Sequence, residues 1–462
     1  MALYRKDSGP FKPQQTPFGG FIDGRPARTG PHCLVTGLTG LGKSRRVLGP
    51  GLLMWDGPAV AISSKPDLID LCLERRLEWG GHDKTYVLDM SGQVPDDVLP
   101  PGVIRVYADP VALIANDDDA LDIAGELFKS GTAGQSGGGK DSGGDSFWES
   151  ATIAVLAGVL RAAGEDGVRW ARSAVGRIQP PTEEDTETPC WINAIDRLER
   201  MGSDDLADEI EEAMTGEEKF RDSVRITAKT GLVPWLRTTV RGRPGEVPFL
   251  PEMLEEGCAT LFMVAPADGV AAGAAVATVD AISNHWRRGQ TRKIPLPQLL
   301  VVADELCNTL PWSKLPTVVT ESRAMGLALL VAVQSTTQFA RRYGEAGMVE
   351  LRAVFPSILC LAGTGTTEPE ILKAAAWAHG QSEWQKITVD HKGNQSQTSE
   401  RVDTMHGAEL IPDSIDHGRL LRGSHPDSTG PALSEAGLLV DLFDISTIPF
   451  KTATATSTPA AA

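Results

Sequence analysis

The sequence has few cysteines and lacks the spacings that form a disulfide framework or bind a metal. Its 462 residues contain six cysteines with no C-x-x-C pair among them, and its eight histidines show no metal-ligand spacing. Small secreted domains held by disulfides and zinc modules both depend on such spacings, so both classes are excluded. This cysteine usage is typical of a reduced, intracellular protein.

Long apolar runs are also lacking. A helix that spans a bilayer needs about 20 consecutive apolar residues, and the longest apolar segment, residues 151–163, is too short and predicts a buried helix. No signal peptide opens the chain, whose first residues are polar and rich in proline. We therefore expect a cytoplasmic protein that reaches the inner face of the cell membrane only through a partner.

Positively charged residues are fewer than negatively charged ones. The chain has 44 Lys and Arg against 61 Asp and Glu, which gives a net charge of −17. Proteins that coat nucleic acid use Lys and Arg to neutralise phosphates, so a broadly basic surface is excluded, whereas a locally basic channel is not. Repulsion between like charges, which keeps a protein soluble, explains the total equally well.

The sequence does contain a phosphate-binding loop. Residues 37–44 read Gly-Leu-Thr-Gly-Leu-Gly-Lys-Ser, which fits the pattern G-x-x-x-x-G-K-[ST]. An apolar run suited to a buried strand precedes the loop at 32–36, and residues 45–48 can open a helix whose N-terminus favours an anion. We predict that ATP is bound by Gly37, Thr39, Gly40, Leu41, Gly42, Lys43 and Ser44. Within this set Lys43 reaches the β- and γ-phosphates and Ser44 coordinates Mg²⁺.

An ATPase also needs an acid beside Mg²⁺ and a group that activates water. Asp304 and Glu305 directly follow the apolar run 299–303, which predicts a strand. In open parallel sheets ligands bind beyond the carboxyl ends of the strands. We predict that Asp304 holds Mg²⁺ together with Ser44 and that Glu305 is the catalytic base. The alternative is that these acids only cap a helix.

Two further residues are candidates for catalysis. Gln334 ends the next predicted strand, 327–333, and its amide would reach the γ-phosphate or the attacking water because neighbouring strands lie about 5 Å apart. Arg323 lies on the predicted helix between these strands and can face the nucleotide of an adjacent subunit. The alternatives are a polar strand cap for Gln334 and a surface salt bridge for Arg323.

The order of the apolar segments predicts an α/β protein with a mainly parallel sheet and an inserted all-helical domain. The strands that we predict are residues 18–22, 32–36, 59–63, 85–89, 103–107, 259–264, 299–303, 327–333 and 357–362. The helices that we predict in the insertion are residues 147–163, 191–201, 204–214 and 217–236, after a glycine-rich loop at 130–146. The domains are an N-terminal arm (1–30), a nucleotide-binding domain in two parts (31–115 and 246–450), the helical insertion (116–245) and a disordered tail (451–462).

Charged residues gather in four segments, three of them within the insertion. Acids crowd residues 183–218, as a solvated face or as a docking surface for a basic partner. Arg221, Arg225 and Lys229 recur every four residues on one helix face, where they line a pore around phosphates or pair with acids of a neighbouring subunit. Residues 237–243 and 285–288 contain further basic side chains.

Several short motifs occur together and in one order over most of residues 18–440. They are Thr36-Gly37-Leu38-Thr39-Gly40-Leu41-Gly42-Lys43-Ser44, Ser64-Lys65-Pro66-Asp67-Leu68, Phe147-Trp148-Glu149, Val302-Ala303-Asp304-Glu305, Glu321-Ser322-Arg323-Ala324-Met325-Gly326 and Val333-Gln334-Ser335. In this combination the sequence resembles the type IV secretion coupling proteins, the conjugative DNA-transfer ATPases, within the FtsK/HerA group of P-loop motors.

The resemblance implies a RecA-like P-loop ATPase with an all-helical domain, assembled as a homo-hexamer that pumps DNA. In that family the strand-end acids and the glutamine have the roles given above, and the arginine acts in trans, which favours that role for Arg323. Such proteins usually carry N-terminal transmembrane helices, and this sequence shows none, so we expect a separate subunit to provide any membrane contact.

The predicted function is an ATP-hydrolysing motor that pumps single- or double-stranded DNA during conjugative transfer, as a coupling protein of a type IV secretion system. Its predicted cofactors are ATP and Mg²⁺, and its predicted partners include a relaxase or other secretion-system proteins. Two alternatives stay open. One is an ATPase that recruits and translocates protein substrates through a secretion channel, and the other is an ATP-dependent switch without translocation.

Overall fold

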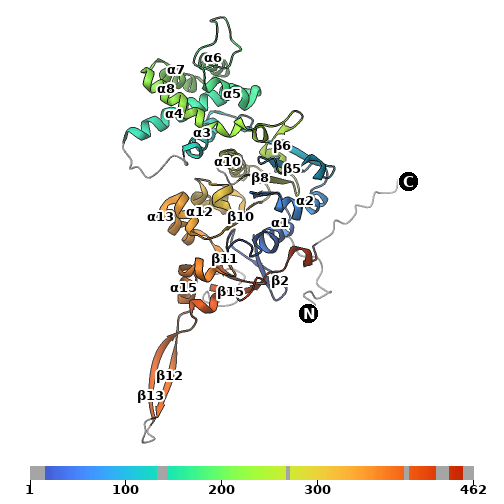
Figure 1. Cartoon of the computed structure of the whole chain (residues 1–462), viewed down its shortest axis with the longest axis vertical. Helices are drawn as coiled ribbons and strands as arrows, with labels where there is room; N and C mark the ends of the chain where they lie inside the picture. Colours follow the sequence, from blue (N-terminus) through green and yellow to red (C-terminus); the bar gives the residue numbers. More distant parts are fainter. Residues whose placement is uncertain (1–15, 133–142, 267–270, 390–394, 423–435, 451–462) are drawn as a thin grey trace, which may run out of the picture.

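The computed structural model describes residues 16–132, 143–266, 271–389, 395–422 and 436–450 of the chain. The molecule is elongated (Figure 1): a helical region lies at one end, a large sheet covered by helices lies in the middle, and a two-stranded hairpin projects from the other end. None of the described helices is long and apolar enough to cross a membrane.

A 13-stranded sheet with the order β2-β1-β15-β14-β11-β3-β10-β9-β4-β8-β5-β6-β7 forms the body. From β11 to β7 every neighbouring pair is parallel, whereas β14, β15, β1 and β2 extend the sheet in antiparallel fashion. The strands are β1 (Phe18–Ile22), β2 (Arg25–Arg28), β3 (His32–Thr36), β4 (Ala59–Ser63), β5 (Thr85–Asp89), β6 (Val103–Tyr107), β7 (Val247–Pro248), β8 (Thr260–Val264), β9 (Leu299–Ala303), β10 (Leu327–Val333), β11 (Ser357–Leu361), β14 (His417–Arg422) and β15 (Ala436–Asp441).

The central strands form because their sequences are apolar throughout. β3, β4, β8, β9 and β10 are buried along their whole length, as parallel strands covered on both faces must be. The predicted α/β fold with a mainly parallel sheet is therefore confirmed. The antiparallel extension was not predicted beyond β1, because β2 and β14 mix arginine with apolar residues and are only partly buried.

Helices cover both faces of the sheet and build two separate cores. Alternate residues of one strand belong to different cores: Leu34 of β3 packs in the larger core, and its neighbours Cys33 and Val35 pack in the smaller one. The helices of the body are α1 (Gly49–Met54), α2 (Asp67–Gly80), α10 (Ala272–Gly289), α11 (Leu306–Thr309), α12 (Leu315–Met325), α13 (Thr337–Val354), α14 (Thr364–Thr367) and α15 (Pro369–Ala378).

The helical region contains α3 (Asp117–Thr132), α4 (Gly143–Ala163), α5 (Gly167–Val175), α6 (Trp191–Met201), α7 (Asp204–Thr215), α8 (Glu218–Gly231) and α9 (Thr238–Arg241). The predicted helix over 217–236 is wrong at its C-terminal end. α8 stops at Gly231, and a short 3₁₀ turn, Val233–Leu236, follows with Pro234 in its first turn. Proline lacks the N–H that would continue the α-helical pattern, which explains the break. α3 and α4 include residues 130–132 and 143–146 of the predicted loop, and its residues 133–142 lie outside the described part.

Polar contacts join the helical region to the body where α3 faces α10. Arg288 of α10 pairs with Asp119 of α3 at 2.7 Å. Ser313, in the segment after α11, donates to the buried carboxylate of Glu126 at 2.9 Å. Lys314 pairs with Asp122 of α3 at 3.9 Å and with the buried Asp280 of α10 at 2.9 Å. Because the segment with Ser313 and Lys314 closely follows the strand-end acids of β9, the helical region is tied to the same edge of the sheet.

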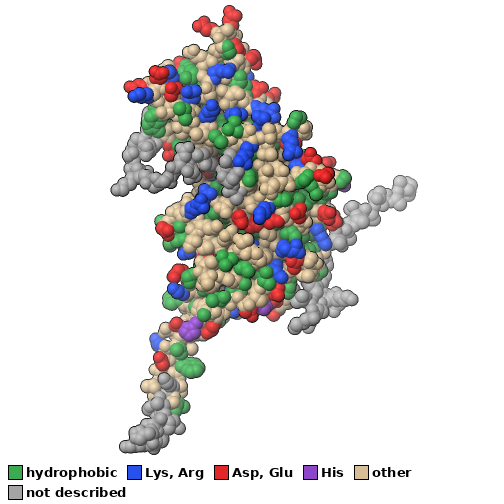
Figure 2. Space-filling model, in the orientation of Figure 1, with side chains coloured by type: hydrophobic (Ala, Val, Ile, Leu, Met, Phe, Trp, Pro, Cys, Tyr) green, Lys and Arg blue, Asp and Glu red, His purple; other side chains and the backbone are tan. Residues whose placement is uncertain are grey.

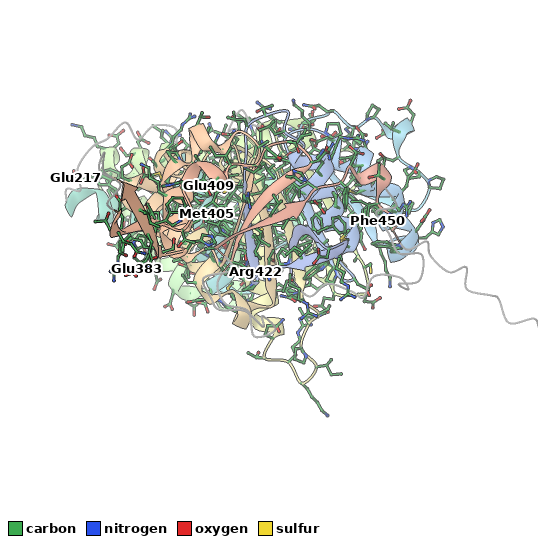
Figure 3. The ribbon with its side chains drawn as sticks, turned by 90° about the horizontal axis from the view of Figure 1, so that it is seen from below. Glu217, Glu383, Met405, Glu409, Arg422 and Phe450 are labelled. Atoms are coloured by element: carbon green, nitrogen blue, oxygen red, sulfur yellow. The ribbon has the colours of Figure 1, made fainter. Side chains whose placement is uncertain are left out.

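The projecting hairpin consists of β12 (Gln381–Val389) and β13 (Gln395–Asp403), which pair only with each other in the described structure. Most of the hairpin side chains that the structure describes are exposed, including Trp384 (70% exposed). Seen from below, Glu383 of the hairpin lies on the same side of the molecule as Met405 and Glu409, and Phe450 lies on the opposite side (Figure 3).

Arg76 of α2 is a buried residue whose hydrogen bonds connect several segments of the body. It is fully buried, and burial lowers its pKa to about 10. Its guanidinium donates to the carbonyl oxygens of Trp55 (2.7 Å), Gly57 (2.7 Å) and Cys258 (3.0 Å) and to the Thr260 hydroxyl (2.7 Å). It therefore ties α2 to the segments that lead into β4 and β8.

We expect Arg76→Ala to lower the free energy of unfolding by about 3–5 kcal/mol, because it leaves several buried carbonyls without a donor. Urea denaturation measures this change. The matched control is Arg200→Ala, which removes an exposed pair with Asp196 and should cost no more than about 1 kcal/mol. Equal losses for the two variants would contradict the assignment.

Candidate functional site

The phosphate-binding loop joins β3 to the helical segment Lys43–Leu48 at the carboxyl edge of the sheet. Gly40 and Gly42 have φ angles of 83° and 81°, which favour glycine strongly over residues with a side chain. Around Gly40 the space that a Cβ would occupy is open. The glycines thus let the loop curl and present its backbone N–H groups to an anion at a helix N-terminus.

Lys43 is folded back against the loop. Its side chain is buried, and its ammonium donates to the carbonyl oxygens of Gly37 (2.7 Å) and Leu38 (3.2 Å). Burial lowers its pKa, and the nearby carboxylates of Asp304 and Glu305 act in the opposite direction. An ammonium held at the mouth of the loop is well placed to bind phosphate oxygens.

Ser44 and Asp304, separated by 260 positions in sequence, lie in contact. The Ser44 hydroxyl donates to the Asp304 carboxylate at 2.8 Å. Burial raises the pKa of Asp304, and the hydrogen bond from Ser44 partly offsets this effect. A hydroxyl and a carboxylate side by side are oxygen ligands of the kind that Mg²⁺ prefers, so the pair fits a magnesium ion bound between loop and strand end.

Glu305 has an unusual backbone conformation. Its φ and ψ of 51° and 49° lie in the left-handed region, which a residue other than glycine adopts only at a cost of about 1–3 kcal/mol. Its N–H is bound by the Asp304 carboxylate at 3.0 Å, and its carbonyl oxygen accepts from the N–H of Asn308 at 2.8 Å. The turn directs Glu305 away from the path of the strand and toward Gln334.

The strand order places Gln334 between the loop and the acids. β10 lies between β3 and β9, with Val333 beside Thr36 and Val331 beside Ala303. Gln334 follows Val333, and its side-chain amide donates to the Glu305 carboxylate at 3.4 Å. The structure therefore brings Lys43, Ser44, Asp304, Glu305 and Gln334 together at one edge.

The structure places the remaining candidate, Arg323, on α12, but its side chain lies outside the described part. Two residues earlier on the helix, Glu321 pairs with Arg287 of α10. The role of Arg323 toward an adjacent subunit stays a prediction.

Sequence reasoning gave no role to one acid near this site. Asp67 opens α2 after β4, the strand next to β9, and accepts from the Ser63 hydroxyl at 2.7 Å. It is close enough for its charge to raise the pKa of Asp304. The available signal was its place in Ser64-Lys65-Pro66-Asp67, directly after a predicted buried strand.

Four arginines of the basic segments considered for nucleic acid are engaged within the chain. Arg221 and Arg225 donate to the carbonyl oxygens of Met214 and Gly176, at the C-terminal ends of other helices. Arg287 and Arg288 pair with Glu321 and Asp119. On the face that Figure 2 shows, the described Lys and Arg side chains are interspersed with Asp and Glu. One subunit therefore presents no continuous basic area on that face.

The fold and the loop together define a P-loop nucleotide-binding protein. Comparisons with known proteins identify a smaller group within this class. Residues 298–415 match the family model described as the TraM recognition site of TraD and TraG. No curated protein matches the chain significantly in sequence.

The chain is similar to solved structures of a conjugative coupling protein over nearly its whole length. The bacterial conjugative coupling protein TrwBdeltaN70, in an unbound monoclinic form, is 20% identical with a TM-score of 0.62, covering 96% of this chain and 91% of that chain. The plasmid coupling protein TrwB in complex with ADP and Mg²⁺ is 19% identical with a TM-score of 0.59 and the same coverage. TrwB in complex with a non-hydrolysable ATP analogue is 20% identical, with a TM-score of 0.59 and coverage of 96% and 92%. The resemblance to type IV coupling proteins is confirmed, and with it the predicted RecA-like fold with a helical domain.

The position of Lys43 predicts a loss of nucleotide affinity in Lys43→Ala. Removing a charged donor to phosphate is worth about 1.5–3 kcal/mol, which corresponds to about 10- to 150-fold in Kd. Titration with a fluorescent ATP analogue measures the change. Lys84→Ala is the control, because Lys84 is exposed and pairs with Glu256 next to the start of β5, away from the carboxyl edge. An unchanged Kd for Lys43→Ala would contradict the site.

Proposed function

We propose that this protein is an ATP-hydrolysing motor that moves DNA during conjugative transfer, as the coupling protein of a type IV secretion system. The observation that carries the proposal is the contact of Ser44 with Asp304 beside Glu305 and Gln334. It is supported by the fold shared with a conjugative coupling protein whose solved structures hold ADP with Mg²⁺ or an ATP analogue.

Each residue of the site has one task in this proposal. The loop amides and Lys43 bind the phosphates, and Ser44 and Asp304 would hold Mg²⁺, which would supply positive charge beside those phosphates. Glu305 accepts a proton from the attacking water, and Gln334 holds that water in line with the γ-phosphate. The 3.4 Å contact between the two side chains places them close enough to bind one water molecule together.

The proposed assembly is a homo-hexamer around the DNA, with Arg323 of one subunit at the nucleotide of the next. The match of residues 298–415 to a TraM recognition site supports a relaxosome protein as a partner, and we propose that a partner also brings the motor to the inner face of the membrane. Because the arginines of α8 and α10 are engaged within the chain, DNA contacts would come from other residues or from rearrangement in the ring.

A second candidate function is the translocation of protein substrates. The outer face of α7 favours it, because this face carries only acidic residues at its exposed charged positions: Asp204, Asp205, Asp208, Glu209, Glu211 and Glu212. Such a face suits a basic export signal. A solvated helix face is the simpler explanation, so we rank this function below DNA transport.

ATPase assays with single-stranded DNA, double-stranded DNA and no DNA test the proposed function. We expect DNA to raise kcat, and we expect Glu305→Gln to bind the ATP analogue normally while lowering kcat about 10²- to 10⁴-fold, because it removes the general base. Stimulation by a basic protein substrate alone would favour the second candidate. A Glu305→Gln variant with normal turnover would refute the assigned chemistry.

Complementation tests the role of Arg323. We expect Arg323→Ala to lower kcat about 10³-fold, as loss of a residue that stabilises transition-state charge does. Mixing this variant with Lys43→Ala should restore part of the activity, because some interfaces of a mixed ring then combine an intact Lys43 with a neighbour's intact Arg323. Normal hydrolysis by Arg323→Ala in an assembled ring would show that Arg323 is not a catalytic residue.

A further inference from the structure

Glu368 is a buried acid with no role in the chemistry described above. It lies between α14 and α15, and its side chain is fully buried. Burying a carboxylate is costly unless charged or polar groups compensate for the lost water. Its partners are therefore informative about why an acid stands at this position.

All the side-chain partners that the structure gives Glu368 belong to α13 or to the turn that precedes it. One carboxylate oxygen accepts from the N–H of Thr336, and the other accepts from the Thr336 hydroxyl at 2.6 Å. Arg352 of α13 pairs with the second oxygen at 3.5 Å and also donates to the Thr336 hydroxyl at 2.5 Å. Acid, hydroxyl and guanidinium thus form one buried cluster.

The cluster holds the segment that carries Gln334. Beyond Val333 the chain leaves the sheet, so strand pairing no longer fixes its position. Three contacts replace that pairing: Gln334 N–H to the Gln338 side chain (3.0 Å), the Ser335 hydroxyl to the Thr367 carbonyl (3.3 Å) and the double contact of Thr336 with Glu368. Of these, the contact with Glu368 is the only buried, charge-assisted one, and such bonds are about twice as strong as neutral ones.

We propose that Glu368 is a positioning residue for catalysis: through Thr336 it fixes Gln334 at the distance from Glu305 that turnover requires. This inference rests on the proposed function for its kinetic consequence but not for its structural one. A shift of about 1 Å at a catalytic group can cost about 10²-fold in rate, so the anchoring of residues 334–336 is expected to affect turnover rather than nucleotide binding.

The structural consequence is tested by hydrogen exchange in Glu368→Gln. Glutamine keeps the volume and one acceptor, but its NH₂ group faces donors from Thr336 and Arg352, so one bond is lost without a cavity. We expect faster exchange in peptides that cover residues 334–338 and unchanged exchange in the phosphate-binding loop. Glu370→Gln is the matched control, because Glu370 lies two residues further on and is exposed, paired with Lys373. Unchanged exchange at 334–338 would overturn the proposal.

The kinetic consequence is tested by a double-mutant cycle. We expect Glu368→Gln to lower kcat about 10- to 100-fold with KM for ATP and the amount of bound analogue nearly unchanged. In a Gln334→Ala background the same substitution should have little further effect, because the group that it positions is gone. A merely structural role would give the same loss in both backgrounds, and that result, or wild-type kcat in Glu368→Gln, would overturn the proposal. If the unsubstituted protein hydrolyses no ATP with any DNA or protein substrate, the proposed function fails, and hydrogen exchange still decides whether Glu368 holds the segment.

Discussion

The contact between Ser44 and Asp304 is the constraint on which the site depends. It requires β3 and β9 to lie two strands apart in one parallel sheet, with β10 between them. The intervening strand is what makes the arrangement useful, because its end delivers Gln334 into the space between the loop and the acids. A sheet with β3 directly beside β9 would bring the same ligands together and leave no place for a third group.

The apolar strands and the loop could be predicted because their signals are local. A continuous buried run such as β10, or glycines before Lys43, identifies an element without knowledge of its neighbours. The strand-end rule then predicts that Asp304 and Gln334 lie at the same edge of the sheet. Glu368 and Arg76 carry no such signal. Their partners are up to 184 residues away, and a single acid or arginine in a mixed segment is typical of the surface. Beyond β1, the antiparallel strands β2 and β14 and the projecting hairpin were missed for a related reason, since their sequences mix polar and charged residues with apolar ones.

The positions of the charged residues say more about the two candidate cargoes, DNA and protein, than the net charge of the chain does. The arginines of α8 and α10 satisfy carbonyl groups and acids within the same chain, so they stabilise the subunit and are poorly available to phosphates. The acids of α7 are exposed, by contrast. These charges alone do not favour DNA; what favours DNA is the fold and the match of residues 298–415, which point to conjugative coupling proteins. In the proposed function, DNA contacts would come from other residues or from rearrangement in the ring.

The strained turn at Glu305 links fold and chemistry. Its left-handed backbone costs about 1–3 kcal/mol, and it persists because Asp304 and the first turn of α11 bind both sides of the peptide. This backbone conformation sets the direction in which Glu305 lies. An extended Glu305 would continue along the strand, whereas the turned residue faces Gln334. The two halves of the pair are thus held from opposite sides, Glu305 by hydrogen bonds at the end of β9 and Gln334 by the buried Glu368 cluster beyond β10. The anchor of Glu305 includes Asp304, which contacts Ser44 of the phosphate-binding loop. The Glu368 cluster does not include that loop, so the position of Gln334 is the one that is fixed independently of the groups that bind the nucleotide.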